Sequence, residues 1–142
     1  MNKEVNHVLS KCFIAKLTGR EEIPPVCTAA FGIAQFRFNS DFTRLQFKLV
    51  VHDIEQGTAT HIHLGRRGEN RPVVFLFGPV THGISVNRGV VTGVITESDL
   101  IGPLQGMSLL GLAREMDTGN TYVNVHTEKH PAGEIRGQIK RF

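Results

Sequence analysis

Hydrophobic and polar residues alternate along most of this chain with a period of two, the pattern of β-strands that bury one face. The segment 43–51 shows the alternation most clearly, because Leu45, Phe47 and Leu49 share one face and polar side chains stand between them. Comparable short segments, separated by residues that favour turns, occur throughout the chain. The pattern predicts strands at 12–17, 31–38, 43–51, 58–64, 73–77, 88–96, 121–127 and 134–139.

One segment departs from this pattern. Leu109, Leu112 and Met116 recur at helical spacing, and Gly119 follows them as a residue that commonly ends a helix. The segment 104–117 is therefore predicted to hold one short helix. Eight short strands joined by turns, with a single helix, predict an all-β fold in which antiparallel strands form a β-sandwich.

The length and composition fit one globular domain. The 142 residues are 40% hydrophobic and 20% charged, which predicts a single domain over 1–142 in which residues 1–10 form a loosely ordered N-terminal arm. The net charge of +3 comes from 16 basic and 13 acidic residues, with no Trp and one Tyr. Such a small, mixed charge does not predict a nucleic-acid partner, and the lack of Trp together with a single Tyr argues against a base-stacking surface.

The sequence says little about the compartment. No stretch approaches the ~20 apolar residues that cross a bilayer, so no membrane association is predicted. The N-terminus lacks an apolar run long enough for a signal peptide, which favours a cytoplasmic protein or a secreted one that has already been processed. Cys12 and Cys27 are too few for a disulfide framework, and free thiols are the favoured interpretation, with pairing as the alternative.

Histidines provide the candidate chemistry. His61 and His63 lie two apart in a predicted strand, so their side chains point to the same face, roughly 6.6–6.8 Å apart along the chain. In the strand 121–127, His126 falls on the polar face. The three imidazoles converge if these strands are neighbours in one sheet, where they can reach one ion at about 2.0–2.1 Å. His130, four residues beyond His126, is a candidate fourth ligand.

Ligand chemistry leaves several interpretations open. Imidazoles without thiolates suit copper, zinc, nickel or iron, and coordination geometry would select among them. Alternatively, these histidines are half-buried polar residues that only stabilise the strands. No catalytic residue is predicted, because the sequence lacks a Gly-x-Ser-x-Gly elbow, a phosphate loop and a dinucleotide fingerprint. Glu21 and Glu22 are interpreted as a solvated turn, and Glu134 and Arg136 as a pair on one strand face.

The histidines lie in blocks that resemble the CHRD domain family, which is named from chordin and is widespread in bacteria. The resemblance extends over residues 13–139 and is that of a bacterial single-domain member. Its blocks are LTG at 17–19, EIPPV at 22–26, THIHLG at 60–65, GEN at 68–70, PVV at 72–74, Leu100 with Gly102, YVNVHT at 122–127 and PAGEIRGQI at 131–139. Two departures are Cys27, where a small or polar residue is usual, and Arg71, which replaces a common glycine.

The resemblance implies an immunoglobulin-like β-sandwich, and its pattern carries over onto His61, His63 and His126. The His-x-His strand also looks like the copper strand of Cu,Zn superoxide dismutases. A dismutase site needs a metal-bridging His and a zinc-binding Asp soon after that strand, and the segment 64–72 has neither. Dismutase activity is therefore not favoured, and the sequence leaves open whether any reaction is catalysed.

Two functions of different classes remain. The first is a metal-binding β-sandwich, with copper favoured over zinc, that serves in metal handling or redox protection. The second is a non-catalytic interaction or structural module that binds a protein partner, or a second copy of itself, through a sheet edge or a loop. In this second function the histidines are structural.

Overall fold

The computed structural model describes residues 8–65 and 71–142. Strands dominate this part of the chain, and the fold is all-β with one short helix, as predicted. The strands are β1 (Cys12–Thr18), β2 (Phe31–Phe38), β3 (Leu45–Leu64), β4 (Arg71–Phe77), β5 (Ile84–Ile95), β6 (Thr121–Thr127), β7 (Ile135–Gln138) and β8 (Lys140–Arg141). The helix is α1 (Leu109–Asp117), and 3-10 turns cover Gly19–Glu21, Glu97–Asp99 and Gly102–Leu104.

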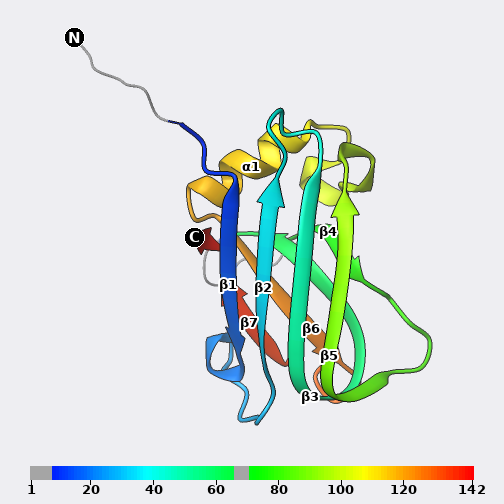
Figure 1. The fold of residues 1–142 in the computed structure, drawn as a ribbon. Helices are drawn as coiled ribbons and strands as arrows, with labels where there is room; N and C mark the ends of the chain where they lie inside the picture. Colours follow the sequence, from blue (N-terminus) through cyan, green and yellow to red (C-terminus); the bar gives the residue numbers. More distant parts are fainter. Residues whose placement is uncertain (1–7, 66–70) are drawn as a thin grey trace.

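The strands form two layers that share β3. The front layer contains β1, β2, the first half of β3, and β5, and the back layer contains β4, the second half of β3, β6 and β7 (Figure 1). Strand β3 passes from the front layer to the back layer after Asp53 and Gln56, which have positive φ angles. At this point the register of β3 with β5 shifts, between Ile54 and Gly57. The predicted strands 43–51 and 58–64 are thus one bent strand, whose polar middle segment interrupts the alternation without ending the pairing.

The sheet closes on itself beside β1. Thr18 pairs with Arg136 of β7, while β2 pairs with both β1 and β3, so the strand order returns to its start and encloses a barrel-like core. Gly137 makes this closure sterically feasible. Its backbone lies against the carbonyl group of Lys16, where a Cβ atom would collide with the oxygen.

Helix α1 covers one open end of the sandwich (Figure 1). Its buried face consists of Leu109, Leu112, Ala113 and Met116, the residues with helical spacing in the sequence. The helix begins at Leu109 rather than near residue 104, because Gly106 adopts a φ of 82° and Ser108 is extended at the N-cap. No helix in the described part of the chain is long and apolar enough to span a bilayer.

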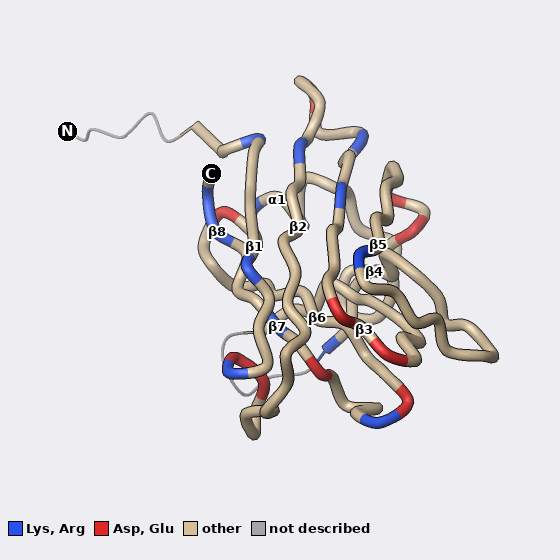
Figure 2. Tube along the Cα trace, turned by 60° about the horizontal axis from the view of Figure 1, so that its bottom comes forward, with Lys and Arg blue, Asp and Glu red and all other residues tan. Residues whose placement is uncertain are grey.

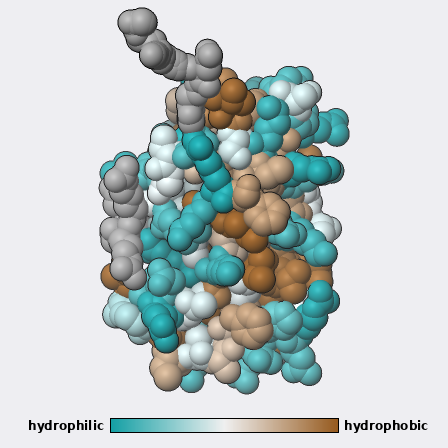
Figure 3. All heavy atoms as spheres, turned by 60° about the vertical axis from the view of Figure 1, so that its left-hand side comes forward, coloured by the Kyte–Doolittle hydropathy of each residue, from teal (hydrophilic) through white to brown (hydrophobic). Residues whose placement is uncertain are grey.

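Charged residues of both signs are spread over strands and loops instead of gathering in one region (Figure 2). From the side of β1, apolar surface lies between polar residues (Figure 3), and the exposed side chains of Phe31 and Ile33 belong to the outer face of the front layer. The predicted N-terminal arm over 1–10 lies partly outside the described residues, which begin at residue 8.

Candidate metal site

Antiparallel pairing of β3 with β6 places the candidate histidines on one face of the back layer. His61 is opposite Asn124, and His126 is opposite Ala59, two pairs further along the same two strands and so on the same face. Ile62 points the other way, into the core, and is fully buried. The expectation that these two strands are neighbours with their histidines on the outer face is therefore confirmed.

The three imidazoles form a compact cluster. One ring nitrogen from each of His61, His63 and His126 lies within 4.8 Å of the other two, so the cluster could hold a metal ion. The closest approach is 3.0 Å, between Nδ1 of His61 and Nε2 of His126. His63 is only 2% exposed, whereas His61 and His126 are half-buried, so the cluster is reached from the side of these two residues.

In His126 and in His63, a hydrogen bond determines which of the two ring nitrogens can bind a metal. Nδ1 of His126 lies 2.8 Å from the carbonyl oxygen of Pro131 and must donate to it, which leaves a lone pair on Nε2. Nε2 of His63 lies 2.9 Å from Oδ1 of Asn124 and donates to it, which leaves a lone pair on Nδ1. Metal-binding histidines characteristically donate from their second nitrogen to such oxygen atoms.

Nδ1 of His63 is buried and has no hydrogen-bond partner in the described structure. Buried polar atoms are almost always hydrogen-bonded, so an exception requires an explanation. The atom belongs to the histidine cluster, where a bound cation would satisfy its lone pair. Among the nitrogens of the three clustered imidazoles, it is the one that is buried without a hydrogen bond in the described structure.

Burial keeps two of the imidazoles neutral. Desolvation, with repulsion from His126, lowers the pKa of His61 to about 4. Desolvation and then repulsion from His61 lower the pKa of His63 to about 3, although the hydrogen bond to Asn124 opposes this shift. Both rings are therefore uncharged at neutral pH, the form that binds a metal ion.

Glu22 lies behind this site and is a residue that the sequence interpretation placed wrongly. It is 6% exposed, not part of a solvated turn, because the 3-10 turn Gly19–Glu21 directs it onto the outer face of the back layer. Oε2 of Glu22 is 3.5 Å from Nδ2 of Asn124. Burial raises the pKa of Glu22 to about 7, opposed by Asn124 and by the positive charge of Arg136. In the sequence, the only feature that distinguishes Glu22 from a solvated residue is its place in the block EIPPV at 22–26, which resembles the CHRD family.

Tyr122 supports His63 from the neighbouring strand. Their rings are stacked with centroids 4.7 Å apart and planes 2° apart, and the guanidinium of Arg136 lies 3.5 Å from the centre of the tyrosine ring. The imidazole of His63 and the guanidinium of Arg136 cannot both lie against the same face of the tyrosine ring, so Tyr122 lies between them. The predicted pair of Glu134 and Arg136 is wrong within the described structure, since Glu134 instead accepts hydrogen bonds from the hydroxyl groups of Thr28 and Thr127.

The remaining candidate ligand, His130, is not a member of the cluster. Its main chain shapes the loop after β6: the amide group donates to Oγ1 of Thr127, and the carbonyl group accepts from the amide of Gly133. Its role as a fourth ligand remains a prediction. Cys12 and Cys27 are both free thiols, as favoured from the sequence.

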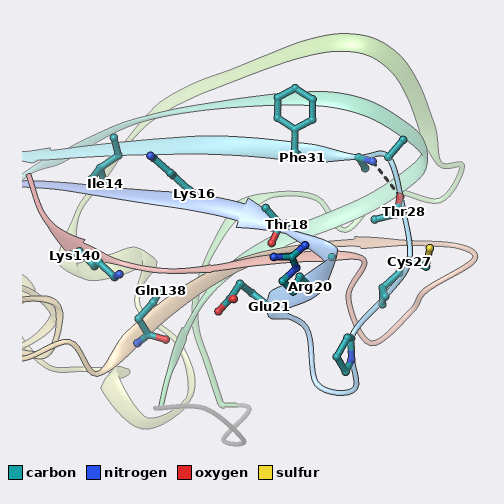
Figure 4. Close-up of a pocket in the computed structure, with 15 residues that line it drawn as sticks. Ile14, Lys16, Thr18, Arg20, Glu21, Cys27, Thr28, Phe31, Gln138 and Lys140 are labelled. Atoms are coloured by element: carbon teal, nitrogen blue, oxygen red, sulfur yellow. Dashed lines mark hydrogen bonds between the residues drawn. The ribbon is translucent and has the colours of Figure 1, made fainter.

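A cavity of about 1150 Å³ lies beside β1 (Figure 4). Lys16, Arg20 and Lys140 line it together with Cys27, and none of the three clustered histidines does. The candidate metal site is therefore a separate feature on the outer face of the back layer.

Comparison with known families supports the resemblance noted in the sequence. The model of the CHRD domain matches residues 13–139. A search of curated proteins found no match for the chain.

Proposed function

The chain belongs to the CHRD domain family, and from this membership and the geometry of its histidines we propose that it is a metal-binding β-sandwich protein, a single domain over 1–142. Family membership supplies no named activity, so the proposal depends on the site. His61, His63 and His126 are the proposed protein ligands. The proposed ion is copper, with zinc as the second candidate, and the proposed role is metal handling or redox protection.

The observation that carries the proposal is the buried, unpartnered Nδ1 of His63 beside two further imidazole nitrogens. The second nitrogens of His63 and His126 are already bonded to oxygen atoms, so the two rings are held in the tautomers that ligation requires. Little proton displacement from His61 or His63 is needed at neutral pH, since their pKa values are about 4 and 3.

His61 is the ligand that has to rearrange. Nε2 of His126 has a lone pair, so the 3.0 Å contact between it and Nδ1 of His61 requires the proton on His61 in the metal-free protein. A metal ion would replace this proton, which would move to Nε2 of the same ring. The change alters neither the charge of the ring nor the position of the strand.

The donor set is the argument for copper. The three proposed protein ligands are imidazole nitrogens without a thiolate, a set that suits Cu(II) as well as Zn(II). Copper also binds nitrogen ligands more tightly than zinc does. Water or His130 would complete the shell.

Calorimetric titration of untagged protein with Cu(II) and, separately, with Zn(II) tests the proposal. The wild type should bind one ion per chain, with Cu(II) the tighter. Because His61→Ala with His63→Ala removes two ligands, this double variant should lose that binding. The matched control is His52→Ala with His82→Ala, which removes two histidines outside the cluster and should bind as the wild type does. Equal binding by the two double variants would contradict the proposed ligands.

A structural role is the second candidate, and the stack of His63, Tyr122 and Arg136 favours it. In this alternative the histidines only join β3 to β6, and the protein acts by binding a protein partner. Chelator would then change neither its thermal stability nor its complexes. The calorimetric result separates the two candidates, because the structural role requires no specific metal ion.

A further inference from the structure

Besides the two-residue β8, which pairs with β1 alone, the sheet has two outer strands, and these two differ in how they are protected. The back layer ends at β4, where Pro72 offers no N–H group. The amide of Ile101 donates to the carbonyl oxygen of Val73 at 2.7 Å, and Gly102 packs against the carbonyl group of Pro72. The segment 101–102 therefore covers the edge of β4 at Pro72 and Val73.

The front layer ends at β5 (Figure 1), and no backbone hydrogen bond within the described residues covers its outer edge. This twelve-residue strand pairs with β3 alone, and within residues 8–65 and 71–142 no backbone hydrogen bond joins it to any other segment. It contains no proline and a single charged residue, Arg88. Natural proteins normally protect long edge strands with charges, proline or a covering segment, because free N–H and C=O groups recruit further strands.

Three of the exposed side chains on β5 are large and apolar. Ile84, Val90 and Val94 are 45%, 46% and 49% exposed. Three apolar residues form a row across the outer face of the front layer. Ile33 on β2 is opposite Val50 on β3, and Val50 is opposite Val90 on β5, where the row ends. An apolar cavity of about 140 Å³ also borders β5 and is lined in part by Ile84 and Val90. Apolar surface thus reaches the unpaired edge.

We propose that two copies of this chain pair through β5, antiparallel and about a two-fold axis, to form one continuous sheet. The pairing satisfies the free backbone groups of both edges and leaves no outer β5 edge, so it stops at a dimer. It also joins the two apolar rows that end at Val90. Face-to-face packing of two front layers is disfavoured by charge, because it would bring together the cations of both copies, which include Lys16, Arg37 and Lys48.

Sedimentation equilibrium of the full chain at about 0.15 M salt tests the pairing. The wild type should approach twice the 15.7 kDa of one chain as its concentration rises. Val90→Lys with Val94→Lys should sediment as a monomer, because it places lysines at the edge in the way that natural edge strands do. Both side chains are exposed, so the variant should retain the fold of the monomer.

The control is Ile33→Lys, which adds a lysine to the same face on β2, a strand paired on both sides. Ile33 is 41% exposed, and this variant should remain a dimer. Amide hydrogen exchange provides a second measurement, since alternate amides of β5 should exchange more slowly at high protein concentration in the wild type alone. A monomeric wild type, a larger assembly, or a dimer that persists in the double lysine variant would overturn the proposal.

Discussion

The side-chain oxygen of Asn124 accepts a hydrogen bond from Nε2 of His63 across 2.9 Å. The amide nitrogen of the same side chain faces Oε2 of Glu22 at 3.5 Å. Asn124 thereby joins a proposed metal ligand to a buried carboxyl group. It fixes the tautomer of His63 and is itself held by a group that changes charge near neutral pH, since the pKa of Glu22 is about 7.

Replacing Asn124 should therefore weaken metal binding without removing a ligand. Asn124→Ala frees the ring of His63 and should reduce metal affinity by about 10- to 100-fold, as loss of such supporting groups does. It should also lower the free energy of unfolding by about 1–3 kcal/mol, because buried polar atoms lose their partners. Calorimetric titration and urea unfolding measure the two effects.

The control for this variant is Gln138→Ala. Gln138 is a partly buried amide on β7 that donates to the carbonyl groups of Gly119 and Thr121 and makes no hydrogen bond to the histidines. Its loss should reduce stability and leave metal affinity unchanged. If both variants bind the metal as tightly as the wild type does, Asn124 does not position His63.

The metal-free protein should become less stable as the pH falls from about 6.5 toward 4. The folded pKa values of His61 and His63, about 4 and 3, lie below the unfolded value of 6.5. In this range the unfolded chain binds the extra protons, so acid favours unfolding. Glu22 has the opposite effect. Its folded pKa of about 7 exceeds the ordinary 4.5, so the folded state holds its proton, and its contribution to stability declines as the pH rises.

Glu22→Gln removes the titrating carboxyl group and leaves the effect of the two histidines alone. Each proton that the two states bind differently changes the free energy of unfolding by roughly 1.4 kcal/mol per pH unit. Between about pH 5 and 6 the wild type should change by up to that amount, since two histidines outweigh one glutamate. The glutamine variant should approach twice the slope. Urea unfolding over this pH range measures both, and identical slopes would show that Glu22 is not protonated in the folded state.

Removal of metal should lower stability if the histidines are ligands. An ion that binds only the folded state, at about 100 times its dissociation constant, adds about 2.7 kcal/mol to the free energy of unfolding. Copper should therefore raise the melting temperature of the wild type, and chelator should reverse the rise. His61→Ala with His63→Ala should melt at the same temperature with or without copper. A rise that this variant retains would place the ion elsewhere.

Alternation along the chain predicted most strands, because a strand that buries one face must alternate whatever its partners are. It failed to predict the continuity of β3. The bend near Asp53 and Gln56 is polar and has positive φ angles, so its sequence reads as a turn. Pairing of Ile54 with Val86 on β5 holds it in the sheet, and that contact joins segments far apart in the sequence.

The candidate site was predictable to the extent that local geometry determines it. Residues two apart in a strand must share a face, which predicted that His61 and His63 lie together. The pairing of β3 with β6 cannot be derived from alternation, which only placed His126 on the polar face of its own strand, and the family pattern agreed with that choice. Glu22 was missed because its neighbours in sequence form a turn, whereas its burial depends on Asn124, 102 residues away.

Gly133 provides a test of how closely the groups behind the site are packed. Its φ is +125°, and a Cβ atom there would collide with Oε2 of Glu22 and lie 2.6 Å from Nδ2 of Asn124. Gly133→Ala should therefore push Asn124 away from His63. We expect the free energy of unfolding to fall by about 2–4 kcal/mol, from backbone strain together with this displacement, and metal affinity to fall with it.

Gly119→Ala is the control that adds backbone strain without displacing Asn124. Gly119 also has a positive φ, +78°, but a Cβ atom there would meet nothing within 4 Å. This variant should lose about 1–2 kcal/mol of stability from the backbone alone and bind the metal as the wild type does. Urea unfolding and calorimetric titration of both variants provide the comparison. Equal metal affinity in the two would mean that the contacts of Gly133 with Glu22 and Asn124 do not hold His63 in place.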